Sequence, residues 1–230
     1  MAKFSPGPLA GQISGSIGGS TYSHNRYGPY IRRRAVPVTS TTEAAMNAKS
    51  RLGNTSQAWQ ALTAAQKLAW KAWGDYNPTI DALGNAQPLA GNVAYIQLNT
   101  RLLQAGQSQI STPPIIPAPP SLASLVQECD IGAGDCDLTF TATPLGAGLM
   151  LRIRAAVVNS GGIKYVRNLM RVVGFSAAAQ ASPFDHQSLV EAVFGTLVVG
   201  QWVHVLVDVL DTATGQVSAA LKDVTQVTTT

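Results

Sequence analysis

Residue types that perform chemistry are sparse in this sequence. Only the glycine-rich stretch near the amino terminus and the three histidines call for a test as catalytic or nucleotide-binding groups. The glycine-rich stretch SGSIGGSTYSHNRYGPYIRRR at residues 14–34 invites a phosphate-loop interpretation. No Gly-Lys-Ser/Thr follows it, and the pattern indicates no flanking strand and helix, so that interpretation fails. His24, His186 and His204 lie in three different contexts, and no Gly-x-Ser-x-Gly supplies a nucleophile. We therefore expect no catalytic residue, no cofactor and no enzymatic activity.

Carboxylates cluster at residues 128–137, which read ECDIGAGDCD. Four acidic side chains around two glycines can hold Ca²⁺, but the spacing differs from that of an EF-hand. An exposed turn between two strands explains the segment equally well, and we expect no metal site. Cys129 and Cys136 are the only cysteines, which excludes a disulfide scaffold and a four-cysteine zinc site. A bridge between them is geometrically possible, but synthesis in a cytoplasm favours free thiols.

The first forty residues combine glycines, tyrosines and arginines without a single acidic residue. Such a segment has no clear helical or strand period and cannot bury a core by itself. We interpret residues 1–40 as an extended arm, poor in regular structure, which becomes ordered against a partner protein, another copy or a nucleic acid. Residues 31–38 are suited to pair as an edge strand on another chain. The side chains expected to bind the partner are Tyr22, His24, Arg26, Tyr27, Tyr30, Arg32, Arg33 and Arg34.

Charge is scarce and unevenly distributed. Charged residues make up 12% of the 230 residues, about half the usual share. Residues 1–40 carry a net charge of +5, residues 41–120 of +2 and residues 121–230 of −3. This gradient favours head-to-tail contact between copies or an acidic partner for the arm. The amino terminus lacks the apolar run of a signal peptide, and no stretch approaches the ~18 apolar residues of a membrane span.

Residues 41–107 are predicted to form a short helical module. Thr41 or Thr42 is suited to cap a first helix, which Gly53-Asn54 is expected to kink or split. Thr63 and Gln66 have the spacing of a capping box, and Gly74 is expected to end the second helix. A third helix is predicted over residues 92–104. We expect the tryptophans of the first two helices to cluster in the core, namely Trp59, Trp70 and Trp73.

Residues 108–120 and 121–230 are predicted to be a proline-rich linker and an all-β domain. The sequence STPPIIPAPP favours polyproline II, which would hold the last domain at a fixed distance from the helices. Alternating hydrophobic residues and turn signals then predict about seven strands, a pattern typical of an immunoglobulin-like sandwich. The predicted strands cover residues 122–128, 137–143, 149–158, 164–173, 189–194, 201–210 and 216–224.

Three blocks of the sequence resemble a group of largely uncharacterised proteins from tailed bacteriophages and prophages. They are SGSIGGSTYSHNRYGPYIRRR, QAWQALTAAQKLAWKAW and LAGNVAYIQLN, and the similarity spans about residues 10–105. Members of this group look like virion structural proteins, and the resemblance supplies no catalytic residues. The carboxy-terminal part resembles a fibronectin type III or immunoglobulin-like domain, which many phage head and tail proteins carry.

The resemblance implies a virion protein that is made in the bacterial host cytoplasm and is present in many copies or as a homo-oligomer. Its expected partners are the major capsid protein or other virion proteins, and no membrane. A capsid-surface decoration protein is the first expectation and a head–tail or tail-associated protein the second. A nucleic-acid-binding protein that uses the basic arm is the alternative from another class. The expected fold is α+β and multidomain: an arm, a helical module and an immunoglobulin-like sandwich.

Overall fold

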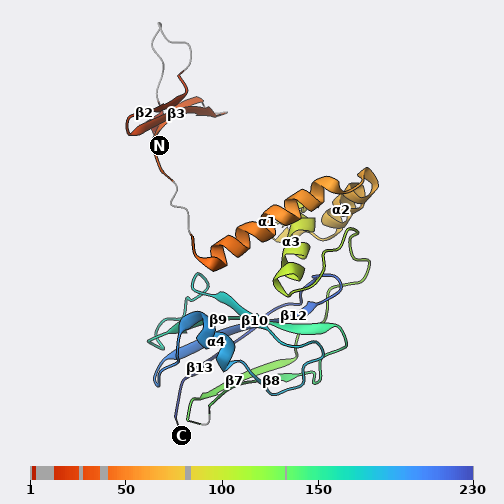
Figure 1. The fold of residues 1–230 in the computed structure, drawn as a ribbon, viewed down its shortest axis with the longest axis vertical. Helices are drawn as coiled ribbons and strands as arrows, with labels where there is room; N and C mark the ends of the chain where they lie inside the picture. Colours follow the sequence, from red (N-terminus) through yellow and green to blue (C-terminus); the bar gives the residue numbers. More distant parts are fainter. Residues whose placement is uncertain are drawn as a thin grey trace. The chain divides into compact units, whose positions relative to one another are not determined.

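The computed structural model describes residues 2–3, 13–25, 28–36, 41–80, 84–132 and 134–229 (Figure 1). The chain divides into two compact units, Met1–Asn47 and Ala48–Thr230. Among the described residues, the first contains a small antiparallel sheet, and the second contains helices together with three further antiparallel sheets, one of which is a two-stranded hairpin. The predicted mixed α+β character is therefore confirmed. Among the described residues, no helix is both long and apolar enough to cross a membrane.

The first unit folds its own strands into a sheet. Strands β1 (Ala2–Lys3), β2 (Gly15–Ile17), β3 (Ser20–Asn25) and β4 (Gly28–Arg33) are arranged in the order β1-β4-β3-β2. The expectation of an extended arm poor in regular structure was wrong, because β4 pairs with β3 of the same chain. The physical reason is turn chemistry: Gly18 adopts a φ of 57° in the two-residue turn between β2 and β3. Residues 37–38 of the predicted edge strand lie outside the described residues.

Three helices follow as predicted, with small differences. Helix α1 spans Glu43–Ala61, α2 spans Ala64–Tyr76 and α3 spans Gly91–Gln104. The capping box of α2 is confirmed: the Gln66 N–H donates to Thr63 Oγ1, and the Thr63 N–H donates to Gln66 Oε1 at 2.9 Å. Helix α1 is continuous through Gly53-Asn54, so the predicted break does not occur.

Gly74 lies inside α2 and does not end it, because the helix continues to Tyr76. This glycine instead permits close contact, since a Cβ there would collide with the Leu89 carbonyl. The predicted tryptophan cluster is confirmed around Tyr95 of α3. The ring centroid of Tyr95 lies 5.3 Å from that of Trp70 and 5.4 Å from that of Trp59, and Trp70 and Trp73 are 6.1 Å apart. These helices therefore share a small aromatic core. A short hairpin of β5 (Thr79–Ile80) and β6 (Ala86–Gln87) joins α2 to α3.

The rest of the second unit consists of two antiparallel sheets that enclose one hydrophobic core. One sheet has the order β11-β8-β7 and the other β10-β9-β12-β13. The core takes Leu138 and Phe140 from the first sheet, and Ile153 and Val205 from the second. The bounds are β7 Ser124–Asp130, β8 Asp135–Thr141, β9 Leu149–Val158, β10 Arg171–Phe175, β11 Phe184–Asp185, β12 Trp202–Asp211 and β13 Leu221–Gln226.

Two of the predicted strands are not strands over most of their length, and the strand predicted at residues 216–224 is observed at Leu221–Gln226. Residues 189–194 belong to helix α4 (Gln187–Phe194), in which Val190 is fully buried. An i,i+4 bond from Gln187 Nε2 to Glu191 Oε1 at 3.2 Å supports one turn of this helix. A run of six mostly apolar residues fits a short buried helix as well as a strand. Residues 164–170 are a loop, and only the end of that predicted strand, from Arg171, is extended.

The proline-rich segment packs against the helices and does not hold the sheets apart from them. The Trp70 Nε1–H donates to the Ser111 carbonyl at 2.9 Å, and the Ile110 N–H donates to Asn99 Oδ1 at 2.7 Å. Helix α3 also contacts the turn between β12 and β13, because a Cβ at Gly215 would lie 2.6 Å from the Leu98 carbonyl oxygen. The expected stand-off is therefore absent, since this turn packs against α3, in which Leu102 is fully buried.

Candidate interface of the N-terminal sheet

Six of the eight predicted partner-binding residues lie in the described part of the N-terminal sheet. Tyr22 and His24 are on β3, Tyr30, Arg32 and Arg33 are on β4, and Arg34 follows directly. The Arg34 N–H donates to the Gly19 carbonyl at 2.8 Å, which extends the pairing beyond β4. Arg26 and Tyr27 lie outside the described residues.

The strand register divides these residues between the two faces of the sheet. Tyr22 pairs with Ile31, and Ser23 pairs with Tyr30. Because successive side chains of a strand point to opposite faces, Arg32 shares a face with Tyr30, and Arg33 shares the other with Ile31. The predicted residues therefore make two separate tyrosine and arginine surfaces. The sequence could not reveal this division without the register.

The described side chains of the N-terminal sheet are accessible on both of its faces. Within residues 13–25 and 28–36, no residue reaches the buried class, and Ile17 and Val36 are 74% and 77% exposed. Tyr22, Tyr30 and Ile31 are only half-buried. A sheet normally needs a packed hydrophobic face for independent stability. These surfaces are therefore suited to contact another molecule.

The electrostatics of the sheet favour an acidic or hydrogen-bond-accepting partner. Arg32, Arg33 and Arg34 are exposed, and none has an ion pair with another described residue. Arginine presents a planar fork of donors that pairs well with carboxylates and phosphates. The two faces thus offer half-buried aromatic rings beside guanidinium groups that form no ion pair with a described residue, an arrangement that can bind protein or nucleic acid.

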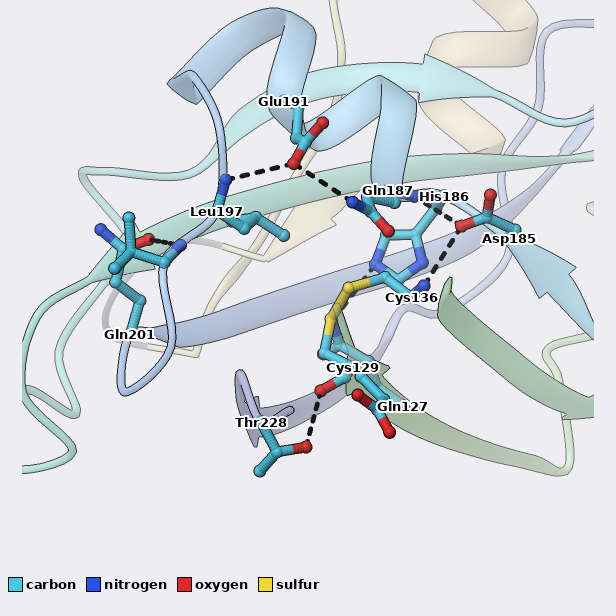
Figure 2. Close-up of a disulfide and its surroundings, with 12 residues drawn as sticks. Gln127, Cys129, Cys136, Asp185, His186, Gln187, Glu191, Leu197, Gln201 and Thr228 are labelled. Atoms are coloured by element: carbon cyan, nitrogen blue, oxygen red, sulfur yellow. Dashed lines mark hydrogen bonds between the residues drawn. A yellow bond between two sulfur atoms is a disulfide. The ribbon is translucent and has the colours of Figure 1, made fainter. Parts of the chain in front are cut away.

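The histidines stay as far apart in role as the sequence predicts. His24 is exposed on β3, whereas His186 and His204 are almost completely buried in the second unit. Figure 2 shows His186 beside Gln127, with Gln127 Nε2 3.2 Å from His186 Nε2. Burial lowers the pKa of His186 to about 4, so its ring is neutral at pH 7. It is therefore a packed residue of the core and not a general base open to substrate.

The two cysteines form a disulfide, which corrects the expectation of free thiols. Cys129 on β7 and Cys136 on β8 are directly opposite each other, with Cα atoms 4.1 Å apart (Figure 2). Both residues are buried beside His186 and Gln127. The sequence argument rested on the redox state of a cytoplasm, whereas the strand register here brings the two sulfur atoms together irrespective of compartment.

The acidic segment forms the tip of the β7–β8 hairpin. Glu128 pairs with Asp137, and Asp130 pairs with Asp135, so like charges face each other across the strands. These four carboxylates line a shallow cavity of about 190 Å³. Burial, together with repulsion from Asp135, Asp185 and Glu128, raises the pKa of Asp137. Residues 131, 132 and 134 form a turn between the two strands. No group of metal-binding geometry occurs among the described side chains.

No protein-family model matches this chain, and no curated protein is significantly similar to it. The function is therefore argued from the residues and their geometry.

Sequence reasoning missed one cluster of charged residues in the second unit. Asp208 of β12 is buried and accepts hydrogen bonds from Arg152 Nε at 2.8 Å and Arg154 Nη2 at 2.6 Å. The signal was present in the alternation of Leu151-Arg152-Ile153-Arg154, which places both arginines on the face opposite the core. Finding their partner required the pairing of β9 with β12.

Proposed function

We propose that this chain is a non-enzymatic structural protein of a bacteriophage virion, most simply a capsid-surface decoration protein that stabilises the particle. The N-terminal sheet, with the helices, attaches the chain to the major capsid protein or another virion protein. Many copies act together, so that a modest contact per copy stiffens the lattice. The protein is made in the host cytoplasm and resides in the virion.

The observation that carries this proposal is the N-terminal sheet, whose described side chains are accessible on both faces. It has half-buried tyrosines and exposed arginines that form no ion pair with a described residue, and it belongs to the smaller of the two compact units. A sheet without a core of its own gains stability when a partner covers it. The resemblance of its sequence to phage virion proteins then suggests which class of partner this is.

The proposal includes an immunoglobulin-like or fibronectin type III identity for the two-sheet domain. The first, second and fifth strands, β7, β8 and β11, share one sheet, and β9, β10, β12 and β13 share the other. This distribution is compatible with a sandwich in which the third, sixth and seventh strands pair and an extra strand joins them. The disulfide joins the first two strands and is not the inter-sheet bridge of antibody domains.

Reconstitution on particles that lack the protein tests the proposed attachment. We expect full-length protein to co-sediment with such particles and to raise the temperature at which they rupture. One double variant alters each face: Tyr30→Ala with Arg32→Gln, and Tyr22→Ala with Arg33→Gln. The double variant of the docking face should bind at least about tenfold more weakly, and Lys164→Gln in the exposed loop between β9 and β10 serves as the control. Undiminished binding by both double variants would refute attachment through the sheet.

Attachment at the head–tail junction or tail is the second candidate within the same class, and electron microscopy of the reconstituted particles separates the two positions.

Nucleic-acid binding remains the alternative because the arginines of β4 have no carboxylate partner among the described residues. In that case affinity for DNA would fall steeply with salt, by roughly one log–log unit per phosphate contact. We expect only weak, non-specific retention of DNA. Sub-micromolar binding of DNA at physiological salt would favour this alternative over a capsid role.

A further inference from the structure

A cationic pocket lies on the outer face of the β10-β9-β12-β13 sheet, away from the hydrophobic core. Its volume is about 390 Å³. Arg154 of β9, Leu206 of β12 and Lys222 of β13 form its floor, and they are direct cross-strand neighbours in the sheet register. The loop that connects β9 to β10 forms the opposite wall and adds Lys164 and Arg167.

The loop wall is fixed in place by its own packing. Val166 is 2% exposed and packs with Ala156 and Val158 of β9. The Met170 N–H donates to the Val166 carbonyl at 3.1 Å, which closes a turn around the buried valine. At the start of the loop, Gly161 lies so close to the Trp202 ring that a Cβ would be 2.7 Å from its Cε2 atom. The pocket is therefore preformed.

The charge of the pocket is not neutralised by the described part of the chain. Lys164, Arg167 and Lys222 form no ion pair with any described residue, and no carboxylate lines the pocket. Arg154 shares the single carboxylate of Asp208 with Arg152, and its Nε–H is buried without a hydrogen-bond partner in the described structure. Four cations thus face one cavity with half of one negative charge to balance them.

Neighbouring groups respond to this positive field. Burial, and repulsion from Arg152 and Arg154, lower the pKa of Arg101 to about 10 although Asp208 acts in the opposite direction. Burial and repulsion from Lys222 lower the pKa of His204. An anion in the pocket would relieve this repulsion as well as pair with the cations.

The remaining lining residues are apolar or aromatic. Leu206 and Met170 present aliphatic surface, and Tyr165 is 74% exposed at the pocket although it is an aromatic residue. A fully hydrated inorganic anion would make no use of these groups. A ring attached to the anion would, because aromatic and aliphatic side chains pack against the flat faces of sugars and bases.

We propose that this pocket binds a phosphate ester of a ring compound, that is, a sugar phosphate or a nucleoside phosphate. The phosphate lies between Lys222, Arg167 and Arg154, where guanidinium and ammonium groups donate charge-assisted hydrogen bonds. The ring lies against Tyr165 and Leu206. This inference does not depend on the virion role, because it concerns a different unit of the chain.

Isothermal titration calorimetry on the full-length chain tests the site with four probes. They are glucose 6-phosphate, adenosine monophosphate, glucose and pyrophosphate. We expect at least one of the two phosphate esters, glucose 6-phosphate or adenosine monophosphate, to bind with a Kd below about 1 mM and glucose not to bind. The preferred phosphate ester identifies the sugar or nucleoside class. Absence of binding by both phosphate esters would overturn the proposal.

Three variants in the pocket and one control outside it locate the binding site. Lys222→Gln and Arg167→Gln should each weaken binding by about tenfold, because each removes a charge-assisted bond. Lys71→Gln removes the same charge from α2, outside the pocket, and should leave Kd unchanged. Tyr165→Ala should weaken the binding of the phosphate ester more than the binding of pyrophosphate. Equal losses with Lys71→Gln and Lys222→Gln would show general charge attraction and would overturn the site.

Carboxylates of a second copy are the competing occupant, since the β7–β8 tip is acidic. Light scattering would then show an oligomer that Lys222→Gln dissociates, and neither phosphate ester would bind. That result would also overturn the proposal.

Discussion

At the scale of single residues, Asp137 provides a test of the acidic hairpin tip. Its pKa is raised by burial and by repulsion from Asp135, Asp185 and Glu128. When the pKa of a carboxyl is raised in the folded state, the folded protein loses stability as the pH increases through that pKa, because the same carboxyl ionises more easily in the unfolded chain. Asp137→Asn should therefore raise the free energy of unfolding at pH 7 by roughly 0.5–1 kcal/mol, and the gain should disappear at low pH.

Urea denaturation of a double-mutant cycle with Glu128→Gln measures this interaction directly. The two residues face each other across β7 and β8, so the second substitution should add less than the first. Fully additive effects would mean that the two carboxylates do not repel each other.

His186 predicts a pH dependence of the opposite sign. Its ring is fully buried, and burial lowers its pKa from 6.5 to about 4. The unfolded chain therefore binds a proton between these values that the folded chain does not, and stability is lost as pH falls from 6.5 towards 4. The loss should reach roughly 3 kcal/mol from this residue. In His186→Gln the slope of unfolding free energy against pH should be flatter in this window, even if the variant is less stable overall. An unchanged slope would assign the acid sensitivity to other groups.

At the scale of elements, two glycines in helices should respond to alanine with opposite signs. A Cβ at Gly91 would lie 2.8 Å from the Lys71 backbone nitrogen, at the contact of α2 and α3. Gly91→Ala should therefore destabilise the protein by about 1–3 kcal/mol. Gly53 of α1 has open space around its Cβ position, and Gly53→Ala should stabilise the helix by roughly 0.5–1 kcal/mol. Chemical denaturation measures both, and equal effects would contradict the close approach.

The ends of helix α2 show what local patterns could and could not predict. Thr63 and Gln66 specify a helix start because the capping box is a local arrangement, and it forms as expected. Gly74 has the same local pattern as a helix end, but its role depends on Leu89, which is distant in sequence and close in space. The long strand β9 was predicted to the residue and β12 to within one residue, whereas α4 was predicted as a strand, because its short apolar run fits both periods.

The candidate interface was predictable in composition and unpredictable in geometry. The tyrosines and arginines of residues 14–34 are visible in the sequence, and so are the glycines that permit tight turns. Pairing β3 with β4 converts this list into two faces, and a shift of one residue in the register would exchange them. The cationic pocket is harder still to predict from the sequence, since its residues come from three strands and a loop.

At the scale of the whole molecule, residues 48–230 should unfold as one cooperative unit. Asn99 is buried and joins α3 to the proline-rich segment through both Ile110 bonds, and α3 contacts Gly215 in the two-sheet domain. Full-length protein should therefore show one main calorimetric transition for this unit. Asn99→Ala should lower its stability by about 1–3 kcal/mol, because it leaves a backbone N–H without its partner. Two separate transitions, with only one moved by Asn99→Ala, would mean that the helices and the sheets are independent.

The fastened proline-rich segment also has a mechanical consequence. A proline-rich spacer with no contacts to the helices would be drawn straight before any fold is loaded. Here a pull applied through α1 meets the Trp70–Ser111 and Asn99–Ile110 bonds before the segment can straighten. Residues 112–120 therefore do not lengthen until those bonds rupture. In single-molecule force spectroscopy the segment should lengthen abruptly, as a step that precedes unfolding of the sheets, and the Asn99→Ala chain should show that step at lower force.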